Sequence, residues 1–178
     1  MKKIVWVCGL IAGFITAFWA VINVNVLGES ASMSLRMFIG YASMVVAFSL
    51  IYVGVKNYRD NQNGGVISFG KAMRISLLIT LVASTVYVVV WLVDFYAFLP
   101  DFGKQYVDAT RAQMIAKGAS AADIQKAVAE TQKAMQQYRN PVFNIMMTYA
   151  EIVPVGIVIS LIASLLLKRN YKPTQATA

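Results

Sequence analysis

Four long apolar segments constrain this chain more than any other feature of its sequence. They cover about residues 4–27, 35–55, 72–97 and 142–167. A transmembrane helix needs about 20 predominantly apolar residues, because each residue advances the helix by about 1.5 Å. Each segment is therefore long enough to cross a bilayer. We expect an all-α integral membrane protein with four transmembrane helices.

Composition agrees with this interpretation and excludes several classes of protein. Hydrophobic residues make up 58% of the 178 residues and charged residues only 13%, whereas soluble domains are about half apolar and about a quarter charged. The chain has no histidine and a single cysteine, Cys8. An intramolecular disulfide and a His/Cys metal site are thereby excluded. No nucleophile–base motif occurs either, so we expect neither an enzyme nor a metal or other cofactor.

The basic residues predict the orientation of the chain, whose net charge is +8. In a membrane protein such a charge orients the spans and contacts lipid head groups, so we do not expect nucleic-acid binding. Lysine and arginine gather on one predicted side: Lys2, Lys3, Lys56, Arg59, Lys71, Arg74, Lys168, Arg169 and Lys172. We expect both termini, including a short polar tail over residues 171–178, to be cytoplasmic. The first segment is too long for a signal peptide and is expected to stay as an anchor.

The connection before the last span, residues 101–139, has helical character of its own. Gly118 suits the position just after a helix, and Ser120 with Asp123 resembles a capping pair at the start of the next one. We expect an amphipathic helical hairpin on the extracytoplasmic side, inserted between the third and fourth transmembrane helices. Pro141 suits the first turn of the fourth span.

Mostly apolar side chains recur at helical spacing along one face of the second hairpin helix. These are Ile124, Val128, Thr131, Met135 and Tyr138. Such a stripe is typical of a hairpin that packs on itself or lies on the membrane surface. It could equally be a docking face for an envelope protein or for a second copy of the chain.

Glu151 is the most unusual residue, because it places a lone carboxylate inside the fourth apolar segment. Charged groups at that depth are costly and often mark functional sites. Pro154, one turn later, is expected to kink the helix beside it. Polar residues that should lie at the same depth in the other three spans are expected neighbours of Glu151. They are Thr16, Ser43, Ser84 and Thr85. Two interpretations stay open: a protonated Glu151 that pins a kinked helix, or a site that responds to protons or cations.

Two stripes of small residues indicate close helix packing. They consist of Gly9, Gly13 and Ala17 in the first span and of Gly156, Ser160 and Ser164 in the fourth. Small residues let helix backbones approach closely in lipid, so each stripe predicts either packing within the bundle or a dimer seam. Ser160 lies opposite Glu151 on a helical wheel. Near the outer face, Asp94 and Arg36 share one level and are expected either to make contact or to be solvated separately.

The loop from Tyr58 to Ala72, with the sequence YRDNQNGGVISFGKA, is similar to a recognisable stretch of a bacterial membrane family, domain of unknown function 4199. The fourth span, with Glu151, Pro154 and Gly156 followed by Ser160 and Ile162, resembles the same family. The resemblance covers about residues 5 to 168. It implies four spans with a helical insertion before the last. The family has no assigned activity, so the resemblance implies no functional residues.

Two functions agree with these features. The first is a non-enzymatic accessory or assembly protein of the cell envelope, located in the bacterial inner membrane and acting through the outer hairpin. The second is a small oligomeric transporter or channel subunit that uses Glu151 as an intramembrane proton or cation site. Membrane lipids are expected partners in both cases, together with either an envelope protein or further copies of the chain.

Overall fold

The computed structural model describes residues 1–26 and 33–169, and these residues fold into α-helices. The elements are α1 (Lys2–Asn25), α2 (Met33–Gln62), α3 (Phe69–Ala97), α4 (Phe102–Ala116), α5 (Ala121–Tyr138) and α6 (Pro141–Leu167). Four of them, α1, α2, α3 and α6, are long and apolar enough to cross a membrane. The all-α class and the membrane-capable helices are thus confirmed. The predicted end of the first span at residue 27 and the tail over residues 171–178 lie outside the described residues.

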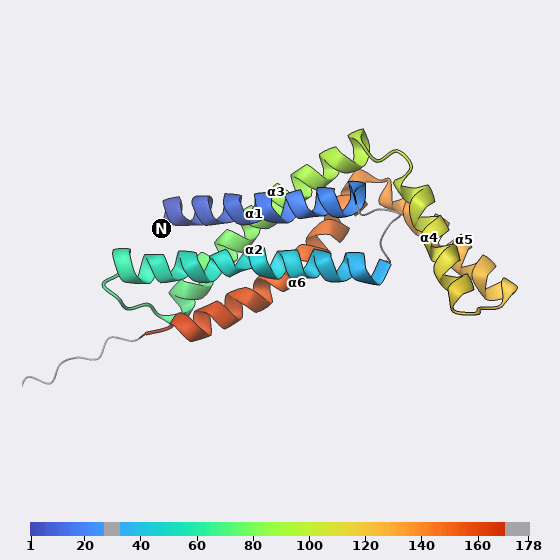
Figure 1. Cartoon of the computed structure of the whole chain (residues 1–178). Coiled ribbons are helices and arrows are strands. Elements are labelled where there is room, and N and C mark those ends of the chain that lie inside the picture. Colours follow the sequence, from blue (N-terminus) through green and yellow to red (C-terminus); the bar gives the residue numbers. More distant parts are fainter. Residues whose placement is uncertain (27–32, 170–178) are drawn as a thin grey trace, which may run out of the picture.

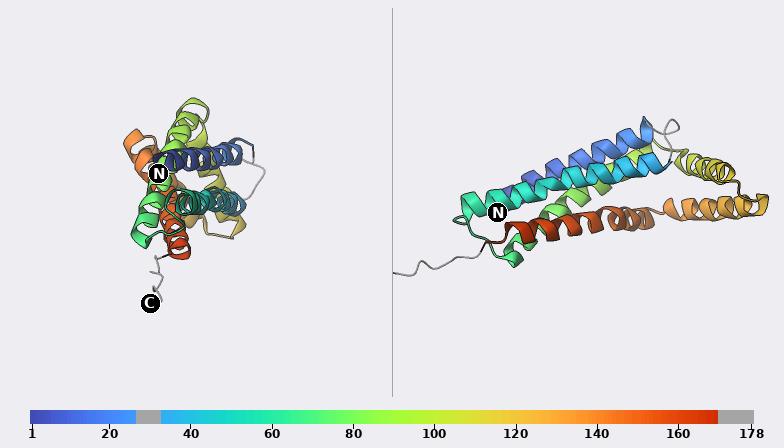
Figure 2. Two further views of the ribbon diagram at one scale, coloured as in Figure 1. Left: turned by 90° about the vertical axis from the view of Figure 1, so that its left-hand side faces the viewer. Right: turned by 60° about the horizontal axis from the view of Figure 1, so that its bottom comes forward.

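The four long helices form one bundle, and α4 and α5 extend from one end of it (Figure 1). In that view α1 and α2 run side by side, while α3 and α6 cross them obliquely. The N-terminus, the α2–α3 connection and the end of α6 gather at the opposite end. Figure 2 shows α2 and α6 diverging towards the hairpin. The bundle is therefore closed at one end and wider at the other.

Helix α3 is the central element, because both α1 and α6 pack extensively against it. Gly9 and Gly13 of α1 face α3 so closely that a Cβ at Gly13 would lie 2.6 Å from the Cβ of Val86. On α6, a Cβ at Gly156 would overlap the methyl group of Thr80. Both small-residue stripes therefore serve contacts within the chain. Neither pairs with the other, since each lies against α3.

Hydroxyl pairs continue the α3–α6 contact beyond Gly156. The Oγ1 atom of Thr80 lies 3.1 Å from the Oγ atom of Ser160, and the Oγ atoms of Ser76 and Ser164 are 3.5 Å apart. All four residues are buried. A single hydrogen bond between transmembrane helices contributes only modestly to the stability of a helix pair. Small residues allow such bonds to form where the two helix backbones also pack closely.

The closed end is held together by turn and main-chain contacts. Helix α2 continues past the predicted span to Gln62 and ends where Gly64 and Gly65 adopt φ values of 64° and 78°, a conformation that favours glycine. Ile67 and Arg169 then form an isolated antiparallel bridge, with N–H···O distances of 3.0 and 2.9 Å. This bridge ties the start of α3 to the end of α6.

The local signals predicted for the hairpin are present. Gly118 follows α4 with a φ of 70°, and the Ser120 side chain caps α5 by accepting a hydrogen bond from the backbone N–H of Asp123. Asn140 caps α6 in the same way, with Pro141 in the first turn. These turn signals position the α4–α5 pair directly before the last long helix.

Candidate ligand cavity

A cavity of about 820 Å³ lies between the wide end of the bundle and the hairpin. Its wall takes side chains from all six helices, with α4 contributing the most on the hairpin side. Pockets that bind small molecules commonly have volumes of about 300–1,000 Å³. The divergence of α2 and α6 thus creates a space of the size that a small ligand needs.

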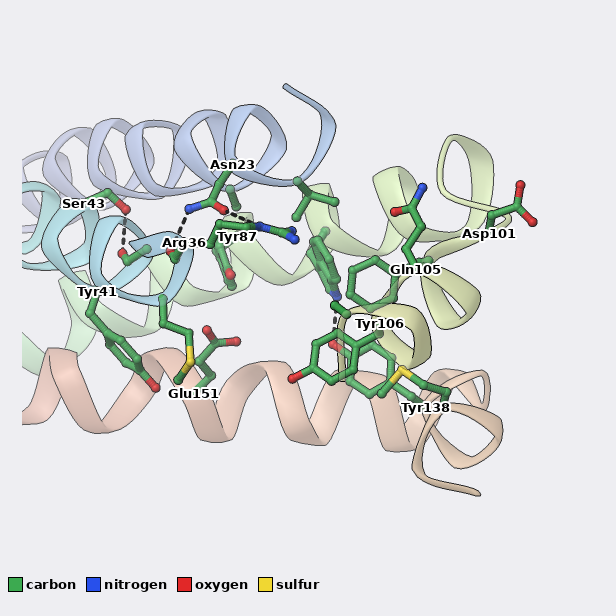
Figure 3. A pocket seen from close by; sticks show the side chains of 18 of the residues that line it. Asn23, Arg36, Tyr41, Ser43, Tyr87, Asp101, Gln105, Tyr106, Tyr138 and Glu151 are labelled. Carbon is green, nitrogen blue, oxygen red and sulfur yellow. Dashed lines mark hydrogen bonds between the residues drawn. The ribbon is translucent and has the colours of Figure 1, made fainter. Parts of the chain in front are cut away.

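Glu151 lines this cavity from α6 (Figure 3). Its side chain rises from the helix towards α2 and α3, next to Tyr41 and Tyr87, and is exposed rather than packed. Within residues 1–26 and 33–169 its carboxyl group makes no protein hydrogen bond and no ion pair. The one ion pair in that part of the chain joins Arg59 to Asp60. A carboxyl group at membrane depth therefore faces an open space without a protein partner.

Two of the polar neighbours predicted for Glu151 line the same cavity, namely Thr16 and Ser43. Both use their hydroxyl protons within their own helices. Thr16 Oγ1 donates to the carbonyl oxygens of Ala12 and Gly13, at 3.0 and 2.9 Å, and Ser43 Oγ donates to Gly40 at 2.7 Å. Their oxygens keep lone pairs free, so towards a ligand they act as acceptors.

The other predicted neighbours do not line the cavity. Ser84 is fully buried in the bundle, and its Oγ atom has no hydrogen-bond partner among the described residues. Thr85 is exposed on another face, where its hydroxyl donates to Leu81 and lies 3.0 Å from the Tyr149 hydroxyl. Pro154 lies inside α6 but away from the cavity wall.

The outer wall of the cavity is organised by Asn23 and Arg36. Asn23 donates from Nδ2 to the Arg36 carbonyl at 2.9 Å, and Arg36 Nε donates to Asn23 Oδ1 at 3.3 Å. Figure 3 shows the Arg36 side chain running past Asn23 towards the hairpin. Asp94 takes its hydrogen bonds from Asn25, at 3.1 and 3.3 Å, so the contact considered between Asp94 and Arg36 is replaced by two separate amide pairings.

Aromatic side chains form much of the remaining wall. Sequence reasoning named Tyr138 only as part of the α5 stripe and missed the others as site residues: Tyr41, Tyr87, Trp91, Phe102 and Tyr106. Trp91 donates from Nε1 to the Tyr138 hydroxyl at 3.0 Å, and this bond fastens α5 to α3. A tyrosine within an apolar span, such as Tyr87, could have been recognised as a polar group at membrane depth.

Electrostatics link the hairpin tyrosines to the floor of the cavity. Burial raises the pKa of Tyr138 above its ordinary value, and the nearby Glu151 charge raises it further, while hydrogen bonds with Thr148 and Trp91 act in the opposite direction. Burial also raises the pKa of Tyr106; the charge of Arg36 lowers this pKa and that of Glu151 raises it. Both phenols therefore stay neutral at physiological pH and can present their ring faces or hydroxyl groups to a ligand.

A family model described as a protein of unknown function, DUF4199, matches residues 8–169. The chain belongs to the DUF4199 family. This match confirms the resemblance noted in the loop from Tyr58 to Ala72 and in the fourth span. No curated protein and no solved structure gives a significant match.

In this DUF4199 protein the stripe considered as a partner face lies largely against its own hairpin neighbour. Helix α5 packs on α4, and Val128 of the stripe and Val107 of α4 are both buried, at 8% exposure each. Ile124, Thr131, Met135 and Tyr138 are half-buried. The stripe thus stabilises the hairpin and contributes Met135 and Tyr138 to the cavity wall. Among the described residues, no group of three His, Cys, Asp or Glu side chains is placed to hold a metal ion.

Proposed function

We propose that this protein is a non-enzymatic bacterial inner-membrane protein that binds a small molecule in the cavity between its bundle and its hairpin, as a binding or transport subunit. The observation that carries the proposal is the unpartnered Glu151 carboxyl group facing a cavity of about 820 Å³. A partnerless ionisable group at membrane depth is costly, and such groups usually face a pathway or a ligand site. A bound molecule would supply the partner that the described residues do not provide.

An accessory or assembly role in the cell envelope is the second candidate. It is favoured by the hairpin, which projects from the bundle and presents its outer surfaces (Figures 1 and 2). Because the α5 stripe packs against α4, any partner would contact the charged outer faces of α4 and α5 instead. The ligand-binding role ranks first, since side chains from all six helices line the one cavity that Glu151 faces.

We expect both termini to be cytoplasmic and the hairpin to be extracytoplasmic. The closed end of the bundle carries the basic residues Lys2, Lys3, Arg59, Lys168 and Arg169, and an excess of lysine and arginine marks cytoplasmic ends. A reporter that is active only in the cytoplasm, fused after Ala178, should therefore be active. The same reporter inserted after Gly118, at the turn of the hairpin, should be inactive. The opposite pair of readouts would reverse the proposed topology.

Filling the cavity should remove ligand binding without unfolding the protein. Gly40 lines the cavity from α2, and a Cβ added there would meet no atom within 4 Å. Gly40→Phe therefore places a ring in open space, and replacing a helical glycine generally favours the helix. Native mass spectrometry of the protein, purified in mild detergent, should detect a retained small molecule in the parent protein and none in Gly40→Phe.

Gly70→Phe is the matched control, because Gly70 also has open space around a Cβ but lies at the closed end of the bundle, outside the cavity. It should retain the same molecule as the parent protein. Equal retention by Gly40→Phe and Gly70→Phe would contradict a ligand site in the cavity.

A further inference from the structure

The charge at the floor of the cavity defines which ligands can bind there. Glu151 makes no hydrogen bond or ion pair with the described residues, yet it faces the cavity interior. An anionic ligand would be repelled at this point, and a neutral apolar ligand would bury the carboxyl group without a partner. A ligand that carries a positive charge or several N–H donors would satisfy it.

The neighbouring polar groups offer the same kind of atom. Ser43 and Thr16 donate their protons to backbone carbonyls of their own helices, so towards the cavity they can only accept hydrogen bonds. Together with the Glu151 carboxylate they bring hydrogen-bond acceptors from α1, α2 and α6 to the cavity wall, where the hydroxyl groups of Tyr41 and Tyr87 can either donate or accept. A protonated amine donates up to three hydrogen bonds and matches this set.

The rings around the acceptors favour an organic rather than an inorganic cation. Tyr41, Tyr87, Trp91 and Tyr106 line the cavity, and the face of an aromatic ring attracts an ammonium group. Ca²⁺ would need about six to eight oxygen ligands, and Mg²⁺ a near-octahedral set. One carboxyl group and two hydroxyl groups in an aromatic cavity do not provide that number. The volume also suits a ligand with a sizeable apolar body.

The basic residues of the wall do not cancel the charge of Glu151. Arg36 is held by Asn23 and extends towards the hairpin, and Lys104 belongs to α4 on the hairpin side. Asp101 and Asp108 line that same side. The hairpin side is thus of mixed sign, while the membrane-embedded side carries Glu151 alone.

We propose that the cavity binds an organic cation, an ammonium group carried on an apolar body, with the ammonium group at Glu151 and the body against the rings of α2, α3 and α4. This proposal rests on the proposed function and specifies its ligand class. The ammonium group would enter from the hairpin side and bind between Glu151, Ser43 and Thr16. Tyr41 and Tyr87 would flank the charge.

Trp91 supplies a direct reporter of binding, because it lines the cavity. The other tryptophans, Trp6 and Trp19, are exposed on α1, so Trp6→Phe with Trp19→Phe leaves Trp91 as the single tryptophan. Three probes are titrated into this full-length protein in lipid nanodiscs: benzylammonium, which carries three N–H donors, its uncharged carbon isostere ethylbenzene, and benzenesulfonate. We expect a saturable change in Trp91 emission with benzylammonium and none with benzenesulfonate. The isostere should bind about tenfold more weakly or worse.

Glu151→Gln should weaken binding of benzylammonium about tenfold or more while leaving the thermal stability of the protein unchanged, since no hydrogen bond or ion pair with the described residues is lost. Glu130→Gln, on an exposed position of α5, is the matched control and should bind like the parent protein. The comparison of the three probes on the parent protein does not depend on whether either variant folds.

The possible outcomes distinguish a wrong ligand class from the absence of a ligand site in the cavity. Equal binding of benzylammonium and ethylbenzene, blocked by Gly40→Phe, would overturn the cation proposal and leave the cavity as a ligand site. Preferential binding of benzenesulfonate would overturn it as well. If no probe changes Trp91 emission and Gly40→Phe retains the same molecule as the parent protein, both the cation proposal and the proposed function fail.

Discussion

Gly156→Leu is expected to leave little folded protein after purification. Gly156 is buried where α6 meets α3 and α2, and a Cβ there would overlap the Thr80 methyl group and lie 3.2 Å from Phe48 Cζ. Overpacking of a core costs about 1–3 kcal/mol even when the neighbours can adjust. Here the added side chain would displace the buried Thr80 and Phe48 side chains, and the neighbouring Thr80–Ser160 hydrogen bond would be lost as well. We expect the free energy of unfolding to fall by about 3 kcal/mol or more.

Gly70→Leu is the control for this substitution, because Gly70 is exposed and a Cβ there meets no atom within 4 Å. The two variants are compared by yield of monodisperse protein in size-exclusion chromatography and by thermal unfolding in detergent. Gly70→Leu should match the parent protein in both. Parent-like yield and melting temperature for Gly156→Leu would mean that α3 and α6 are not in close contact at this position.

Val128→Glu is expected to open the hairpin while the bundle stays folded. Val128 is buried between α5 and α4, so the substitution places an unpaired carboxyl group in apolar surroundings. Helices of 15 and 18 residues are marginal on their own and depend on packing against each other. In hydrogen exchange, amides of α4 and α5 should exchange about a hundredfold faster, whereas those of α3 and α6 should keep their protection.

Ala129→Glu introduces the same side chain one residue later, where α5 is exposed, and should exchange like the parent protein. Both variants place a glutamate in the middle of α5 and add the same charge, and they differ chiefly in the burial of the changed residue. If Val128→Glu exchanges like Ala129→Glu, the stripe on α5 is not held against α4. It would then be available as the partner face considered from the sequence.

The membrane-capable helices could be predicted from the sequence because lipid imposes both a length and a composition on each span. The caps at Ser120 and Asn140 are formed by residues next to the helix that they cap, and the cap at Ser120 could be predicted from Asp123 three residues later. Helix α2 runs to Gln62, past the predicted span limit near residue 55. Charged residues end the apolar segment there, but they do not interrupt backbone hydrogen bonding.

Helix pairing and the cavity could not be predicted, for a common physical reason. Spacing determines which residues share a face of a helix, but it does not determine which element covers that face. Gly13 and Gly156 were recognisable as packing positions, yet nothing local assigned both to α3. Matching residues by their depth along the spans selected Thr16 and Ser43, which line the same cavity as Glu151. It also selected Ser84 and Thr85, which do not line that cavity.

The bridge between Ile67 and Arg169 gives the bundle a fixed pivot. It joins the start of α3 to the end of α6 through main-chain hydrogen bonds, while the opposite ends of the long helices spread around the cavity. A helix of 29 residues such as α3 is about 43 Å long. A tilt of about 5° at the bridge therefore displaces the far end by about 4 Å, roughly the thickness of an aromatic ring. A small change of helix angle at the bridge would therefore change the width of the cavity at the opposite end of the bundle.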